Sequence, residues 1–423
     1  MSDTTVLPAP GRTDNDLALG LLRQPRSVLF GPGQRRQLPR VVAEIGRHAL
    51  LVTDERMASS TEFREIADGL RAAGVEVEVF DRTEAELPRE NVMEVAERYR
   101  SVPIDVIVGV GGGSCLDLAK VSAVVLANGG DVRDYYGEFL VPGPGVPVVT
   151  VPTTGGTGAE VTCISVVFDG ERGMKVGVAS PHLEATVAVI DPELTLTCPP
   201  GLTAATGADA LSHLVEAFTG RAKNPTPEEL ATKLYAGKNV LTDVYARQGL
   251  SLLGRSLPAV AADGSDLSAR TDTMFASYCA GMAINTAGTA GAHAIQSPIG
   301  NLTHTPHGFG VAALLPWVMR YNLPSRIAEF AEIARLLGAG DASASDEERA
   351  REGIRAVEGL LRALGAPTDL ATLGLSSDDF GFVADQALLA TRLTANNPRE
   401  LTREAVLEIL RRGHAADRDW WGE

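Results

Sequence analysis

The chain has 423 residues, of which 44% are hydrophobic and 22% are charged, an ordinary balance for a soluble globular protein of about two domains. Its formal net charge of -16 repels phosphate backbones and anionic membranes, so we expect neither nucleic acid nor a membrane as a partner. Four cysteines without C-x-x-C spacing are too few for a disulfide scaffold. We therefore expect a cytoplasmic protein with a polar, disordered tail over residues 1–20.

The first half of the chain alternates between two kinds of periodicity. Strand-like runs occupy 48–54, 75–81, 105–113 and 146–158, and helical runs occupy 61–74 and 92–101. The last two strand-like runs end in glycine-rich turns. Strands that alternate with helices favour parallel pairing in a doubly wound sheet. The sequence therefore predicts an α/β domain over residues 21–200.

From about residue 200 the pattern becomes helical. Helices are predicted over 202–220, 230–253, 266–285, 327–337, 353–365 and 402–413. The stretch 338–352 is biased in composition and is interpreted as a loop that runs into an acidic helix start. Two prolines and a glycine within 198–202 separate the alternating strand and helix pattern from the helical pattern that follows. We therefore expect an all-helical domain over residues 201–423.

The run VIVGVGGGSCLDLAK combines a strand, a glycine cluster and a helix start. Glycine lets the backbone approach a ligand closely, and the N-terminus of a helix favours an anion. Ser114 and Asp117 have capping-box spacing, which predicts a helix start at Ser114. The alternative is a tight turn without a ligand. The usual Rossmann fingerprint is absent, since Ser114 replaces its last glycine and the acidic strand end, Asp54, precedes the glycines.

Asp54 is a candidate for reading the ribose of a nucleotide. A carboxylate accepts hydrogen bonds from a ribose 2′-OH and repels a 2′-phosphate. The alternative is a solvated acid in a turn.

A pair of candidate metal ligands lies in TGADALSHLVEAF. Asp209 and His213 are four residues apart, so they share one face of a helix. With Ser212 and Glu216 they form a narrow polar stripe on an otherwise apolar helix. Such a helix should be buried, with its stripe facing a lined cavity. The alternative is an amphipathic helix with its polar side in water.

Two histidines further along the chain complete a possible ligand set. His293 lies among small residues, where a neutral imidazole needs a hydrogen bond or a metal. His307 lies between Pro306 and Gly308, a turn that could aim its ring. One carboxylate and three imidazoles suit Fe(II) or Zn(II).

Several motifs occur in one order along the chain: GGGSCLDLAK, PTTGGTGAEVT, TGADALSHLVEAF, the segment from His293 to PHGFG, and LLPWVMRYN. In these motifs the chain resembles the iron-activated (group III, iron-containing) alcohol dehydrogenases over nearly its whole length. The resemblance implies an α/β dinucleotide-binding domain with a parallel sheet, followed by an all-α metal-binding domain. This architecture is shared with dehydroquinate synthase, and catalysis would take place between the two domains.

The resemblance also implies roles for individual residues. Asp54 would favour NAD over NADP, and Lys175 would lie near the nicotinamide ribose. The other implied cofactor residues are Gly111, Gly112, Gly113, Ser114, Asp117, Thr153, Thr154 and Thr157. The implied metal ligands are Asp209, His213, His293 and His307.

The chain departs from the family pattern in four places. Many members carry a histidine where this chain has Ser297, so Ser297 acting through water, or His304, is the candidate for moving a proton. Trp317 stands where the family has the histidine of L-L-P-H. Leu87 replaces an asparagine that often contacts the cofactor, which predicts weaker cofactor binding. The segment 224–239 resembles the insertion of the hydroxyacid–oxoacid transhydrogenase branch.

The function implied is that of a metal-dependent, NAD(H)-linked oxidoreductase that interconverts a small primary alcohol and its aldehyde by hydride transfer. Fe(II) is the expected metal, with Zn(II) as the alternative, and a homodimer or larger homo-oligomer is expected. Three other functions stay open: a transhydrogenase with tightly bound nicotinamide, a lyase resembling dehydroquinate synthase, and a nucleotide-binding relative that has lost catalysis.

Overall fold

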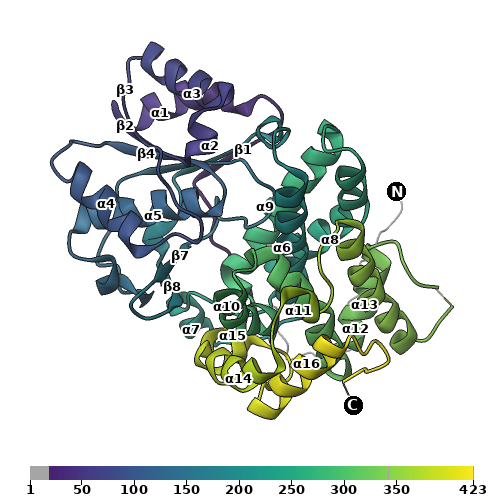
Figure 1. Cartoon of the computed structure of the whole chain (residues 1–423). Helices are drawn as coiled ribbons and strands as arrows, with labels where there is room; N and C mark the ends of the chain where they lie inside the picture. Colours follow the sequence, from purple (N-terminus) through teal and green to yellow (C-terminus); the bar gives the residue numbers. More distant parts are fainter. Residues whose placement is uncertain (1–18, 342, 423) are drawn as a thin grey trace.

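A six-stranded parallel sheet forms the centre of the N-terminal half, with strand order β1-β9-β6-β4-β2-β3 (Figure 1). The computed structural model describes residues 19–341 and 343–422, so most of the tail predicted over 1–20 lies outside the described residues. Every residue of β4 and β6 is buried, as expected for strands covered on both faces. The strands of this sheet are β1 Ser27–Phe30, β2 His48–Val52, β3 Glu76–Phe80, β4 Val106–Gly111, β6 Val148–Pro152 and β9 Val187–Ile190.

Helices cover both faces of this sheet (Figure 1). Because successive side chains of a strand point to opposite faces, Leu51 packs with α1 Leu38–Ile45 and α3 Thr61–Ala72. Leu50, beside it, packs with α4 Arg89–Tyr99 and α5 Gly113–Asn128. The short helix α2 Glu55–Ala58 follows β2 at the carboxyl edge of the sheet. The predicted α/β architecture with a parallel sheet is confirmed.

A second, three-stranded sheet of order β5-β8-β7 was not predicted. Its strands are β5 Gly137–Glu138, β7 Ile164–Asp169 and β8 Met174–Ala179. β7 and β8 form an antiparallel hairpin, and β5 pairs in parallel with β8. This hairpin carries Lys175.

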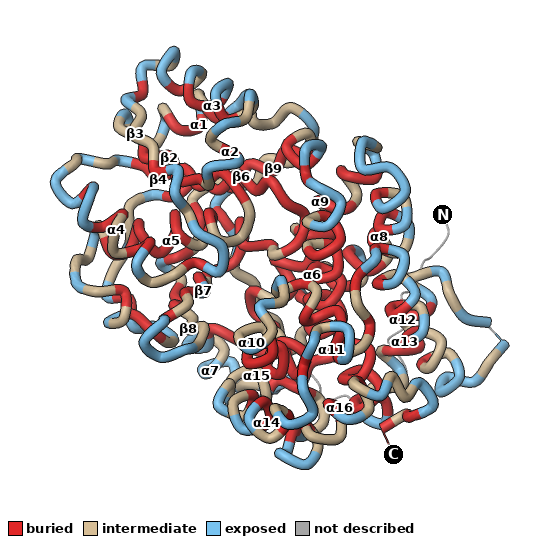
Figure 2. The backbone as a smooth tube through the Cα atoms, viewed as in Figure 1, coloured by how far each residue is buried: buried red, intermediate tan, exposed pale blue. Residues whose placement is uncertain are grey.

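The C-terminal half is helical and packs around α6 Pro200–Thr219, which Figure 2 shows buried along most of its length. One hydrophobic core joins side chains from α6, α8, α9, α11, α13 and α16. The remaining helices are α7 Pro227–Thr232, α8 Val240–Ala262, α9 Leu267–Ala287, α10 Gly291–Thr303, α11 His307–Asn322, α12 Ile327–Leu336, α13 Asp346–Ala363, α14 Phe380–Leu389, α15 Thr391–Asn396 and α16 Arg403–Ala415. Among the described residues, no helix has both the length and the apolar character needed to cross a bilayer.

Two local predictions were wrong. The single helix predicted over 230–253 is broken, because Gly237 has a φ of +74° and Asn239 caps the start of α8 by accepting from the backbone N–H groups of Leu241 and Thr242. The capping box predicted at Ser114 is also absent, since α5 begins one residue earlier and its N-cap is Gly112. The predicted domain limit near residue 200 stays a prediction; the last strand ends at Ile190 and α6 begins at Pro200.

Candidate metal and cofactor site

The carboxyl edge of the parallel sheet brings distant cofactor candidates side by side. β2 and β4 are neighbours with Val52 opposite Gly109, and β6 follows with Pro152 opposite Gly111. The turns after these three strands therefore lie next to one another. In open parallel sheets this edge is where ligands bind.

Asp54 follows β2 and lies beside the glycine-rich turn. Its Oδ1 accepts from the backbone N–H of Met57 at 2.8 Å and so caps α2. Its Oδ2 lies 3.7 Å from Cys115 Sγ. A methyl group added at Gly111 would come within 3.8 Å of the same Oδ2. The carboxylate thus stands at the entrance of the turn, although Asp54 precedes it by more than fifty residues.

The turn after β6 packs directly on the glycine-rich turn. A methyl group at Gly113 would lie only 2.7 Å from Thr157 Cγ2, and one at Gly112 would lie 3.5 Å from Thr154 Oγ1. Glycine at position 113 is therefore required for this close approach. Ser114 is half-buried in the first turn of α5, where backbone N–H groups lack partners within the helix. These groups can receive a pyrophosphate.

Thr153 and Asp117 have other surroundings. Thr153 is buried, and its hydroxyl has no hydrogen-bond partner among the described residues. Asp117 accepts from the backbone N–H of Val166 at 2.9 Å and forms an ion pair with the buried Lys120 at 3.0 Å. Asp117 thereby ties α5 to β7, and its contact with a cofactor stays a prediction.

Lys175 reaches the site from the second sheet. Its ammonium group forms an ion pair with Glu86. Burial lowers the pKa of His307 and the positive charge of Lys175 lowers it further, whereas the position of Lys175 near a nicotinamide stays a prediction. Glu86 and Leu87 both have positive φ, and Leu87 is buried. The weaker cofactor binding expected from Leu87 stays a prediction.

The loop over residues 153–158 connects the nucleotide side to the helical half. A methyl group at Gly156 would come within 2.6 Å of Thr206 Cβ on α6, and one at Gly158 within 2.3 Å of Gly281 on α9. Thr206 precedes Asp209 by one helical turn. One loop therefore contacts both the glycine-rich turn and the helix that carries Asp209.

The four predicted metal ligands gather around Asp209. Three of them, Asp209, His213 and His293, offer ligand atoms that all lie within 4.8 Å of one another, and His307, outside this mutual set, approaches Asp209. Asp209 Oδ1 lies 3.5 Å from His213 Nε2, 3.5 Å from His293 Nε2 and 3.6 Å from His307 Nε2. The first three residues are buried, with exposed fractions of 3%, 6% and 8%. The alternative of a water-exposed polar stripe on α6 is therefore wrong.

The donor set fits a divalent ion. Atoms held at about 2.1 Å around one tetrahedral ion lie about 3.4 Å apart, close to the separations from Asp209 Oδ1. Asp209 Oδ1 and His293 Nε2 are buried and have no hydrogen-bond partner among the described residues. Such groups need a partner, and a metal provides one for both.

Glu216 orients His293, a role that the sequence did not assign. One carboxylate oxygen of Glu216 accepts from the backbone N–H of Ala290 at 2.8 Å and lies 2.6 Å from His293 Nδ1. The other oxygen accepts from the N–H of Ala292 at 2.6 Å. Glu216 on α6 therefore caps α10 and leaves His293 Nε2 free for a metal. The sequence could have indicated this role, because Glu216 belongs to the polar stripe of the helix and follows His213 by three residues.

Gln296 plays the equivalent part for His307. Its Oε1 lies 2.8 Å from His307 Nδ1, and the Gln296 side chain is buried. His307 is the first residue of α11 and follows Pro306, so the predicted turn lies at a helix start. Gln296 is three residues after His293 on α10, a spacing that could have indicated its role.

The charges around the site favour a bound cation. Burial alone would raise the pKa of the Asp209 carboxyl, but the charges of the surrounding histidines hold this pKa well below its usual range. Burial lowers the pKa of His213, and it lowers that of His307 to about 3. Burial would also lower the pKa of His293, but the charges and hydrogen bonds of Glu216 and Asp209 together outweigh it and raise this pKa to about 9. An ionised Asp209 with two imidazoles held neutral suits a metal.

Of the predicted proton-transfer residues, Ser297 lies in the middle of α10, and His304 caps its C-terminal end. Ser297 is half-buried, one turn after His293 on the same helix face, and its hydroxyl makes no hydrogen bond within the described residues. His304 is exposed and ends α10 with a φ of +52°. Trp317 lies away from this chemistry, because it is fully buried in the helical core and donates to the carbonyl of Thr368.

Comparison with known proteins agrees with this geometry. The family model of iron-containing alcohol dehydrogenase matches residues 25–192. The model for the C-terminal part of the Fe-containing alcohol dehydrogenase family matches residues 203–414. The two matches divide the chain between the α/β half and the helical half.

Individual relatives match over nearly their whole length. The chain is 34% identical over 388 residues to the NAD-dependent methanol dehydrogenase of Bacillus methanolicus, covering 92% of this chain and 98% of that protein. It is 36% identical over 401 residues to the 1,3-propanediol dehydrogenase of Klebsiella pneumoniae, covering 92% and 97%. The crystal structure of a 1,3-propanediol oxidoreductase matches with a TM-score of 0.87 at 34% identity, covering 93% and 100%. The chain therefore belongs to the iron-containing alcohol dehydrogenase family.

Proposed function

We propose that the protein is a metal-dependent, NAD(H)-linked oxidoreductase that interconverts a small primary alcohol and its aldehyde. The observation that carries this proposal is the convergence of three imidazole Nε2 atoms on Asp209 Oδ1, beside the loop that packs on the glycine-rich turn. Relatives named methanol dehydrogenase and 1,3-propanediol dehydrogenase support small primary alcohols as the substrate class.

Asp209, His213, His293 and His307 would hold the metal, and we propose Fe(II), with Zn(II) as the alternative. When bound, the ion supplies a Lewis acid for the substrate oxygen, and the nicotinamide supplies the hydride carrier. Glu216 and Gln296 hold two of the imidazole rings in the orientation that such an ion requires.

The residues of the sheet edge would position NAD. The first turn of α5, at Gly113 and Ser114, receives the pyrophosphate, and Thr154 and Thr157 close the turn from the second loop. Asp54 reads the ribose and disfavours NADP through charge repulsion. Lys175, on the adjacent hairpin, contributes positive charge near the nicotinamide end.

Ser297 is the proposed route for the proton, through a water molecule, with His304 as a second candidate. The hydroxyl of Ser297 is free to bond to water and lies on the helix face of His293. Ser297→Ala should lower kcat and change its pH profile while metal content stays that of the wild type. An unchanged pH profile would move this role to His304, for which His304→Gln is the corresponding test.

The decisive experiment compares wild type with His293→Ala for metal content and NADH turnover over a panel of aldehydes. We expect one metal per chain in the wild type and the loss of both metal and turnover in the variant. His182→Ala, which removes an exposed histidine of the α/β half, is the matched control and should behave as the wild type. Failure of the wild type to bind metal after anaerobic Fe(II) loading would overturn the proposal.

We also infer a cytoplasmic location and a homo-oligomeric state. All four cysteines are free and buried, which supports a reducing compartment for the protein.

A further inference from the structure

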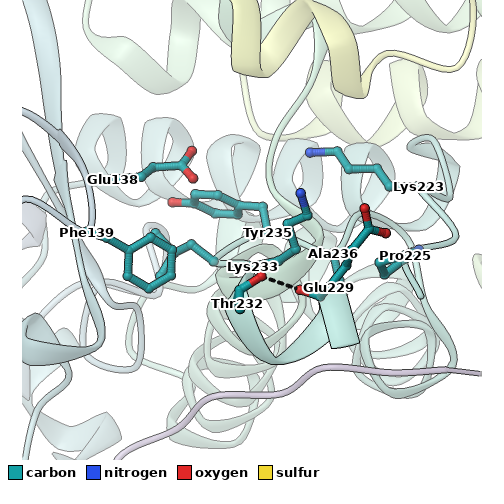
Figure 3. Close-up of a pocket in the computed structure, with 10 residues that line it drawn as sticks. Glu138, Phe139, Lys223, Pro225, Glu229, Thr232, Lys233, Tyr235 and Ala236 are labelled. Carbon is teal, nitrogen blue, oxygen red and sulfur yellow. Dashed lines mark hydrogen bonds between the residues drawn. The ribbon is translucent and has the colours of Figure 1, made fainter. Parts of the chain in front are cut away.

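A pocket with a cavity volume of about 490 Å³ lies beside the segment 224–239 (Figure 3), and none of the metal and cofactor candidates lines it. This volume lies within the range of small-molecule sites. Lys223, Lys233 and Tyr235 line it from the helical half. Glu138 and Phe139 line it from the end of β5. The pocket therefore has walls from both halves of the chain.

The lysines of this pocket differ from the other lysines of the chain. The sequence has five lysines, and Lys120, Lys175 and Lys238 each pair with an acidic side chain. Lys223 and Lys233 form no ion pair or side-chain hydrogen bond with any residue in the described part of the chain. Figure 3 shows their side chains reaching toward the same side of the pocket. Both lysines are exposed and therefore hydrated, and two unpaired cations that line one pocket can receive an anion.

Arg392 adds a third positive charge behind the pocket. Its guanidinium lies 4.4 Å from the ring centroid of Tyr235, and no carboxylate pairs with it among the described residues. Burial lowers the pKa of Lys223, and the charges of Arg392 and Lys233 lower it further, against the opposing effect of Glu138. The cations of the pocket therefore repel one another, and a bound anion would relieve that repulsion.

Tyr235 supplies an unused hydrogen-bond donor. The residue is only 6% exposed, and within residues 19–341 and 343–422 its hydroxyl has no hydrogen-bond partner. The hydroxyl is not among the fully buried side-chain atoms without a partner, so it is open to the pocket, and Figure 3 shows it pointing toward Glu138. Two acids also line the pocket, but Glu229 is engaged at the start of α7, where it accepts from the backbone N–H of Thr226. Among the lining residues two lysines balance two acids, and Arg392 adds a further positive charge behind the pocket.

The backbone contacts of the pocket hold Tyr235 in place. Arg23 donates to the carbonyls of Lys233 and Leu234 at 3.0 and 3.3 Å. The N–H of Ala236 donates to the carbonyl of Thr286 at 2.9 Å. The segment is thus anchored on both sides of Tyr235, and the site is formed before a ligand arrives.

We propose that this pocket is an accessory binding site for a small dianion, such as a phosphate or a dicarboxylate, held by Lys223 and Lys233. The site is separate from the redox site, so the proposal does not depend on the alcohol or aldehyde that the enzyme uses.

NMR of the reductively ¹³C-methylated protein tests the proposal, because five lysines give few signals. Inorganic phosphate and, in a second arm, succinate are titrated into the whole protein. We expect saturable shifts at Lys223 and Lys233 and none at Lys238, which is paired with Asp243. Phosphate at the glycine-rich turn would instead shift Lys175. Either probe bound at Lys223 and Lys233 supports the site, and the comparison tells phosphate from carboxylate.

Variants then test the named groups on the unmethylated protein by calorimetry. Lys223→Gln and Lys233→Gln should each weaken binding of the probe about tenfold, since each removes one charge-assisted hydrogen bond. Arg221→Gln removes a nearby exposed cation that does not line the pocket and should leave the Kd unchanged within twofold. The proposal is overturned if shifts are linear and shared by Lys238, or if Arg221→Gln weakens binding as much as the lysine variants.

Discussion

The substitution Glu216→Gln tests whether a buried carboxylate on α6 organises the metal site. The carboxylate has three partners at 2.6–2.8 Å: the N–H groups of Ala290 and Ala292, and Nδ1 of His293. Glutamine has nearly the same size but only one acceptor oxygen, and its NH₂ group must face one of these donors. The variant therefore removes the charge and places two donors against each other without creating a cavity.

The expected loss follows from these contacts. Hydrogen bonds to a charged group contribute about 1.5–3 kcal/mol each, and at least one is lost. Loss of a residue that orients a metal ligand typically lowers metal affinity by about 10–100-fold. We therefore expect Glu216→Gln to fold, to bind metal about 10–100-fold more weakly, and to regain turnover at high metal concentration. Competition with a chelator measures the affinity, and turnover against metal concentration measures the recovery.

The matched control is Thr219→Val on the same helix. Thr219 is buried one turn after Glu216 and donates only to the carbonyl of Val215, so its replacement removes a buried polar group without touching a ligand. It should keep wild-type metal affinity. The reasoning is refuted if Glu216→Gln also keeps wild-type affinity, or if both variants lose it equally.

Three further predictions concern other parts of the molecule. Asp54→Ser should raise kcat/KM for NADP relative to NAD by about tenfold or more, because the repelling charge is gone; steady-state kinetics with both cofactors measures the ratio. Gln296→Leu should lower metal affinity about tenfold through the loss of its contact with His307, with little change in the NAD Kd. Burial raises the pKa of Glu160 to about 7 from 4.5. The unfolded chain therefore loses this proton first, and the free energy of unfolding falls as pH rises from about 4.5 to about 7. Glu160→Gln should remove this fall, so the free energy of unfolding of the variant should rise relative to that of the wild type by up to about 3 kcal/mol above pH 7. Denaturant unfolding at several pH values measures this difference. The same pH dependence in both proteins would contradict the prediction.

The fold was predictable where local signals and periodicity agree. The helix expected over 266–285 begins where Asp266 accepts from two backbone N–H groups, and α9 follows that prediction closely. The prediction of one helix over 230–253 was wrong. Its apolar spacing favoured a continuous helix, but Gly237 has a positive φ that interrupts the helix. The β7–β8 hairpin was missed although its strands are as long as β4, because most residues of β8 are only half-buried and its apolar pattern is weak.

The sequence predicts which residues of one helix lie together, but it does not reveal contacts between separate elements of the site. Asp209 and His213 are fixed relative to each other by one helix, so their spacing alone placed them together. The contact of Asp54 with the glycine-rich turn depends on the pairing of β2 with β4, which a linear pattern does not reveal. The role of Gln296 depends on how α10 meets α11, and no single helix contains that information.

Asp209 and Glu216 show how the surroundings, and not the residue type, assign a role. Both are carboxylates on one face of α6, and both are only 3% exposed. Glu216 meets two backbone N–H groups and an imidazole at hydrogen-bonding distance, so its charge is satisfied by the protein. Asp209 Oδ1 meets three imidazole nitrogens at 3.5–3.6 Å, too far for a hydrogen bond, and has no other partner among the described residues. Of the two, Asp209 is therefore the carboxylate left for an ion, and Glu216 is the one that holds the ion's other ligands in place.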